Sequence, residues 1–172
     1  MTTPTLHLGF LTVIREPSGY LGGYLVTNQW GRPLEFRLST PVQPNRVQQI
    51  LYAETLEPYV CGELIGKTLV DKTGTAVQVV VTDTEAALEL RQRVEMPVVF
   101  LDSKQNHEIM KDENTKEGSG TSVRSHARYP DDAAAIQETM DKIKGNFDLA
   151  EPFQRIREAM AEARKMGVTQ RA

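Results

Sequence analysis

The sequence predicts an α/β fold in residues 1–102, followed by a polar linker and two helices. Three observations predict it. The first 40 residues hold short runs of apolar and branched side chains, which are typical of strands. Helical periodicity then alternates with short buried runs up to residue 102. Beyond that point large apolar residues become rare until two helical patterns begin. We therefore expect an α/β domain over 1–102, a linker over 103–130 and a helical pair over 131–168.

The first three elements read as an antiparallel meander. Residues 6–14 form an almost continuous apolar run, which predicts a largely buried strand. The stretch "GYLGGYLVTNQWGRPLEFRLS" predicts two more strands, at 20–27 and 34–38, joined by the turn "NQWGRP". Asn28 and Gly31 can take positive φ there, and Pro33 removes one ladder hydrogen bond. Neither feature explains the tryptophan, Trp30, in this turn.

The next four elements alternate between helix and strand. A period near 3.6 predicts a helix that begins near Asn45, and we expect Pro58 to stop or kink it. "AVQVVVTD" predicts a buried strand, "TEAALELRQRV" a helix capped by Asp83 or Thr84, and "MPVVFLD" a last buried strand. The side chains expected to form the main core are Leu8, Phe10, Tyr24, Val26, Ile50, Leu51, Val79, Val81, Val99 and Phe100.

The C-terminal part contains two well-marked amphipathic helices after a linker of polar composition. The first begins at Asp131 or Asp132 and ends before Gly145; the second has Asp148 as its cap and a basic last turn. Their apolar stripes are narrow, so the pair cannot fold alone. The helices either fold back on the α/β domain or bind a protein partner, and the sequence leaves both possibilities open.

Composition limits the possible functions. The chain has 172 residues, 40% apolar and 25% charged, with a net charge of −3, so it lacks the overall basic surface typical of nucleic-acid binders. Nucleic acid is a possible partner but not the favoured one. A single cysteine suits a reducing compartment, and no apolar run could span a bilayer, so we expect a cytoplasmic protein without a membrane contact.

No motif indicates a catalytic residue, metal or cofactor. Cys61 and His7 lack a third group to orient them, and a lone cysteine in an apolar helix is usually core. "CGELIGKT" lacks the first glycine of a phosphate-binding loop and follows a helix instead of a strand. His107 and His126 have no partner at ligand spacing.

The order of elements resembles the ribonuclease-H-like fold over about residues 6–102, with local agreement at "GGY", "PNRVQQILYAETL" and "VVVTDTEAAL". The resemblance implies a site in which clustered carboxylates hold two magnesium ions for attack on a phosphodiester. Only Asp83 lies where such a carboxylate is expected. The first strand has no acid and the helix position holds Gln48, so we expect a degenerate site and no divalent metal in this domain.

The sequence therefore favours a non-catalytic accessory or adaptor subunit for complex assembly, which binds protein partners or a second copy of itself. An aromatic and arginine cluster at the first turn and the apolar stripe of the last helix are the candidate contacts. One alternative is a magnesium-dependent nuclease-like enzyme that uses Glu54, Asp83 and Asp102. Another is a nucleic-acid-binding subunit that uses Arg15, Arg32, Arg37 and Arg46. The predicted partner-binding residues are Trp30, Arg32, Tyr20, Phe153, Ile156 and Met160.

Overall fold

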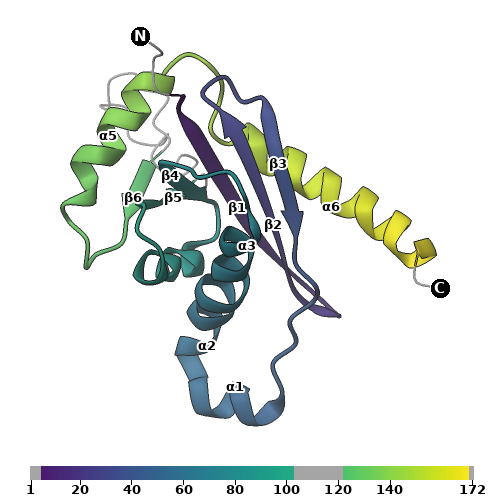
Figure 1. Ribbon diagram of the computed structural model, residues 1–172. Helices are drawn as coiled ribbons and strands as arrows, with labels where there is room; N and C mark the ends of the chain where they lie inside the picture. The colour runs from purple at the N-terminus through teal and green to yellow at the C-terminus, as the bar shows by residue number, and fades with distance from the viewer. Residues whose placement is uncertain (1–4, 103–121, 171–172) are drawn as a thin grey trace, which may run out of the picture.

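A six-stranded mixed sheet forms the centre of the molecule (Figure 1). The computed structural model describes residues 5–102 and 122–170. The strand order is β3-β2-β1-β4-β5-β6, with helices on both faces, so the predicted α/β class is confirmed. The strands are β1 (His7–Glu16), β2 (Gly19–Asn28), β3 (Pro33–Leu38), β4 (Val79–Thr82), β5 (Val98–Asp102) and β6 (Ser122–Ser125).

The sheet combines an antiparallel half with a parallel half. β2 pairs antiparallel with β1 on one side and with β3 on the other, and a bulge interrupts the β2–β3 register at Val26 and Thr27. β4 pairs parallel with β1, and β5 parallel with β4. Because β1 pairs on both sides, its near-continuous apolar run is buried, as the sequence indicated.

The expected linker is shorter than predicted at its C-terminal end. Residues 122–125 form β6, which pairs antiparallel with β5 at the far edge of the sheet. An edge strand needs only one pairing partner and few apolar side chains, so the polar composition of residues 122–125 did not indicate a strand. The rest of the predicted linker up to residue 121 lies outside the described residues.

Helical segments follow β3, and those after the first cover one face of the sheet. The first, α1 (Arg46–Tyr52), begins at a capping box in which Asn45 accepts from the Gln48 amide and the Gln48 side chain accepts from the Asn45 amide. It ends at Ala53, whose φ of 47° breaks the helix, and not at Pro58. Helical structure continues from there through the 3₁₀-helix η1 (Ala53–Thr55), the α-helix α2 (Leu56–Pro58), the π-helix η2 (Tyr59–Gly66) and the α-helix α3 (Lys67–Lys72). A further 3₁₀-helix, η3 (Glu85–Arg93), lies between β4 and β5.

The core on this face shows why part of the predicted core is wrong. Val60, Ile65 and Leu69 pack against Tyr24 and the buried valines of β4 and β5. Ile50 and Leu51, in contrast, are 62% and 76% exposed, because the break at Ala53 carries α1 away from the sheet. The other eight predicted core side chains are buried.

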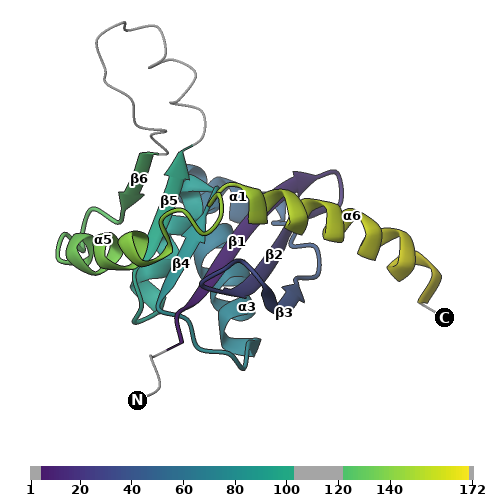
Figure 2. The ribbon, with the colours of Figure 1, turned by 90° about the horizontal axis from the view of Figure 1, so that it is seen from above.

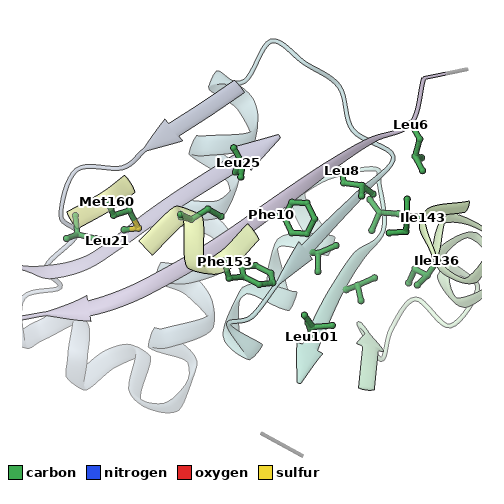
Figure 3. Packing of buried hydrophobic residues seen from close by; sticks show 14 residues of the cluster. Leu6, Leu8, Phe10, Leu21, Leu25, Leu101, Ile136, Ile143, Phe153 and Met160 are labelled. Atoms are coloured by element: carbon green, nitrogen blue, oxygen red, sulfur yellow. The ribbon is translucent and has the colours of Figure 1, made fainter. Parts of the chain in front are cut away.

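The two C-terminal helices cover the opposite face (Figure 2). α5 (Asp132–Ile143) and α6 (Glu151–Gln170) fold back on the sheet, one of the two possibilities that the sequence left open. Phe153 of α6 meets Phe10 of β1 edge to face, with ring centroids 5.6 Å apart (Figure 3). The stripes of both helices share one core with strands β1, β2, β4 and β5. The shared cluster comprises Leu6, Leu8, Phe10, Leu21, Leu25, Val79, Val81, Val99, Leu101, Ile136, Ile143, Phe153, Ile156 and Met160.

Two adjacent glycines in β2 allow helices to approach both faces at the same point. A Cβ atom on Gly22 would collide with Ile65 of η2, and one on Gly23 would lie 2.5 Å from the Cγ2 atom of Ile156 in α6. Successive strand residues point to opposite faces, so a pair of glycines removes one side chain from each. The glycines of "GYLGGYLV" therefore serve close helix packing.

Candidate protein-binding surfaces

The carboxylates of the nuclease-like hypothesis do not form a metal site. Asp83 directly follows β4, and its carboxylate forms an ion pair with Arg157 of α6, so a guanidinium already supplies a positive charge there. Glu54 lies in η1, and Asp102 is the last residue of β5. Within residues 5–102 and 122–170, no group of three or more acidic, histidine or cysteine side chains is placed to hold a metal ion.

Cys61 and His7 do not form a nucleophile and base. Burial in η2 raises the pKa of the Cys61 thiol to about 12, which keeps it protonated at neutral pH. His7 opens β1, and its Nδ1 atom lies 3.2 Å from the carbonyl oxygen of Ala76. No hydrogen bond joins the two in the described part of the chain, and Cys61 is a core residue.

Four of the six predicted partner-binding side chains are buried within the chain itself. Phe153, Ile156 and Met160 form the stripe by which α6 packs on the sheet (Figure 3). Tyr20 is buried against the opposite helices, with the Arg15 guanidinium 5.2 Å from its ring centroid. These four side chains therefore belong to the core and do not contribute to an exposed surface.

Trp30 and Arg32 lie in a turn that several hydrogen bonds hold in place. The Asn28 side-chain oxygen accepts from the amides of Trp30 and Arg32 at 2.9 and 3.0 Å. Gly31 has a φ of 82°, and its carbonyl accepts from Arg155 of α6 at 2.9 Å. The Trp30 side chain is 62% exposed, so it does not fold over the sheet. Its contact with a partner stays a prediction.

The helix α1 carries an exposed apolar surface, which includes the predicted core residues Ile50 and Leu51. Val47, Ile50 and Leu51 are 62%, 62% and 76% exposed, and the helix has no buried residue. Its closest contacts are with η1 and α2, and it lies apart from the sheet (Figure 1). The periodicity identified the helix correctly, but it could not show that Ala53 would turn the apolar side away from the core.

An acidic depression adjoins the C-terminal end of α1. Two neighbouring hollows of about 540 Å³ each share Glu54, Pro58 and Glu89. Tyr52, the last residue of α1, lines one of them and stacks on Tyr59 with ring centroids 4.4 Å apart. The acidic residues that line the hollows are Glu54, Glu57, Glu63, Glu85 and Glu89.

Two of these five carboxylates already pair with arginines, and a third lies beside a histidine. Glu63 pairs with Arg93 at 2.9 Å, Glu85 with Arg124 at 2.5 Å, and Glu89 lies 3.4 Å from the His126 ring. Glu54 and Glu57 are exposed and form no ion pair with the described residues. A ligand of this region would therefore meet negative charge at these two side chains and at Glu89, which pairs with no described lysine or arginine.

The arginines of the nucleic-acid hypothesis are divided between separate interactions. Arg37 pairs with Glu35 at 3.0 Å, and Arg15 lies over the Tyr20 ring. Arg32 lies in the β2–β3 turn, whereas Arg46 begins α1 beyond the other end of β3 (Figure 1).

No helix in the described ranges combines the length and apolar character needed to cross a bilayer. Neither the known family models, nor the curated proteins, nor the solved structures include a match to this chain.

Proposed function

We propose that this protein is a non-catalytic adaptor whose α1 surface and adjoining acidic hollow bind a basic amphipathic segment of a protein partner. The observation that carries the proposal is the exposure of every aliphatic side chain of α1. Exposed apolar groups that cluster on one element are typical of interaction sites, whereas singly scattered ones are not. Val47, Ile50 and Leu51 supply the apolar contact.

The charge near α1 selects the kind of partner. Glu54 and Glu57, which have no ion-pair partner among the described residues, adjoin the helix on the side of Tyr52. A partner helix with apolar residues on one side and lysine or arginine beside them satisfies both features. An acidic helix would be repelled.

The ribonuclease-H-like fold belongs to this proposal as its scaffold. The antiparallel meander of β1, β2 and β3, followed by two parallel strands that helices connect, supports it. The ion pair between Asp83 and Arg157 supports a scaffold without a metal site. We accordingly propose binding, with no catalytic step, as the activity of this domain.

Peptide display against the immobilised protein tests the proposed function. The library contains basic and acidic amphipathic helices of equal apolar content, and fluorescence anisotropy gives the Kd of the selected peptides. We expect basic peptides to bind with micromolar Kd, and salt to weaken the binding. The double variant Ile50→Asp, Leu51→Asp should lose binding, while Ala134→Asp on the exposed side of α5 should retain it.

Circular dichroism should show both variants folded, since all three positions are exposed. Selection of acidic peptides, or undiminished binding of basic peptides to the double variant, would contradict the proposal. The Trp30 turn lies at the other end of β3 from α1, so its contact is tested by a separate peptide selection against the immobilised protein. If Trp30 contacts a partner, Trp30→Ala weakens binding by about 2 kcal/mol without changing the thermal midpoint.

A further inference from the structure

The strand β3 is an edge of the sheet, and no described strand pairs with its outer side. The Ser39 amide donates to the Gly22 carbonyl at 2.9 Å, and Tyr24 lies opposite Arg37. Because hydrogen-bonded pairs alternate along an antiparallel ladder, Arg37 directs its backbone groups toward β2, and Phe36 and Leu38 direct theirs outward. No described residue pairs with these outward groups. An open edge of this kind can pair with another strand.

Apolar side chains of β3 point to one face of the sheet, and its charged side chains point to the other. Phe36 lies opposite Leu25 and Leu38 opposite Gly23, so both point to the face that α6 covers. Leu34, Phe36 and Leu38 are 44%, 36% and 41% exposed. Glu35 and Arg37 point to the other face, where the Glu35 carboxylate accepts from the amides of Gly74 and Thr75 at 3.1 and 3.2 Å.

The order of these residues makes the strand complementary to itself. The segment Leu34 to Leu38 reads apolar, acidic, aromatic, basic, apolar. We propose that two copies of the chain pair antiparallel through β3, with Phe36 opposite its own counterpart on the twofold axis. Glu35 of each copy then faces Arg37 of the other, and Leu34 faces Leu38. The product is one continuous sheet through both copies.

Charge selects this register over its neighbours. A shift that places Glu35 opposite itself leaves two carboxylates facing each other, and a shift that places Arg37 opposite itself leaves two guanidinium groups facing each other. Like charges directly opposite destabilise a strand pair. The register with Phe36 on the twofold axis also allows backbone hydrogen bonds between the copies, because the amide and carbonyl groups of Phe36 and Leu38 point outward. The bulge near Val26 and Thr27 limits the regular edge at its other end, so the paired segment is short.

The charged pair is already partly arranged in a single copy. Glu35 is held by Gly74 and Thr75, and Arg37, which pairs with Glu35 of its own chain at 3.0 Å, is 47% exposed, so it can exchange this carboxylate for the Glu35 of a second copy. This interface shares no residue with α1, so it does not rest on the proposed function.

Sedimentation velocity over a dilution series of the full chain tests the interface. We expect the wild-type protein to dimerise with rising concentration, and Arg37→Glu to raise the dimer Kd about tenfold or more. Glu35→Arg alone should have the same effect. An equimolar mixture of the two variants restores opposite charges at both positions, so it should form a heterodimer. Arg46→Glu makes the same change of charge outside β3 and should leave the dimer unchanged.

A wild-type protein that stays monomeric at every concentration would overturn the proposal. So would a dimer that persists in Phe36→Asp, or variants that fail to associate when mixed although each keeps its circular dichroism spectrum. The double variant Ile50→Asp, Leu51→Asp should sediment like the wild type, so failure of the peptide-binding proposal and failure of this one give different results.

Discussion

Arg91 and Asp132 form an ion pair whose side chains are only 14% and 12% exposed. The Arg91 Nε and Nη2 atoms donate to the two Asp132 oxygens at 2.7 and 3.3 Å, and the Tyr129 ring centroid lies 4.0 Å from the guanidinium carbon. The carboxylate raises the pKa of Arg91 through the hydrogen bond. A single bidentate pair thus fastens the start of α5 to η3 on the other side of the sheet.

Removal of this carboxylate should destabilise the fold. We expect Asp132→Ala to lower the free energy of unfolding by about 2–3 kcal/mol, because it leaves a mostly enclosed guanidinium unpaired. Urea denaturation followed by circular dichroism measures the change. Asp131→Ala removes an exposed carboxylate from the preceding position and serves as the control. Equal effects of the two substitutions would mean that the pair contributes little.

The stability of the fold should depend on pH through Glu35, and the contacts of Glu35 determine the direction of this dependence. Desolvation acts to raise the pKa of Glu35, but hydrogen bonds from Gly74, Thr75 and Arg37 outweigh it and lower the pKa. A carboxyl whose pKa is lowered by folding adds stability above its ordinary pKa near 4.5, and this stability is lost as the pH falls through the folded value.

Glu35→Gln should therefore destabilise the protein at neutral pH, and the difference from wild type should shrink in acid. Thermal unfolding between neutral pH and the acid range, at a concentration low enough to avoid dimers, checks this. A difference that stays constant with pH would show that the carboxylate charge is not the cause.

At the scale of secondary-structure elements, the position of α6 depends on the flat surface of β2. Gly23 lies directly beneath Ile156 and Met160, and a Cβ atom there would lie 2.5 Å from Ile156 and 3.0 Å from the Met160 sulfur. Ion pairs from Arg157 to Asp83 and from Arg164 to Glu16 hold the same helix from the side. Packing and charge thus act together on one helix.

Gly23→Ala should move α6 away from the sheet and lower the free energy of unfolding by about 1–3 kcal/mol, because the added methyl group overpacks the contact. Chemical denaturation measures this, and Gly74→Ala is the control. The space at Gly74 is open apart from a Glu35 oxygen at 3.7 Å, so its effect should stay within about 0.5 kcal/mol. If Gly23→Ala is equally neutral, the helix is not held closely to the strand.

At the scale of the whole molecule, the C-terminal helices complete the fold of the sheet. Phe10, Leu21 and Leu25 on the strands pack against Phe153, Ile156 and Met160 of α6. Without that cover, one face of the sheet would expose a large apolar surface.

A chain that ends at residue 130 should therefore fail to form a stable monomer. We expect aggregation or strong binding of a hydrophobic dye, together with loss of a cooperative unfolding transition. Coexpression with residues 131–172 as a separate chain should restore the transition. A truncated protein that unfolds cooperatively would show instead that the sheet is stable with helices on only one of its faces.

The sequence by itself determined the α/β class, the start of α1 at Asn45 and most of the core side chains, because periodicity and capping are local properties of the chain. It also placed Asp83 after a strand and Trp30 in a turn. Tertiary structure decided the rest. The backbone break at Ala53 left the apolar residues of α1 exposed. Residues 122–125 paired with β5 as an edge strand, and the apolar stripe of α6 packed on the sheet. A positive φ at an alanine is one that the residue itself disfavours. The other two outcomes depend on contacts between segments distant in sequence, whose free energies no local pattern contains.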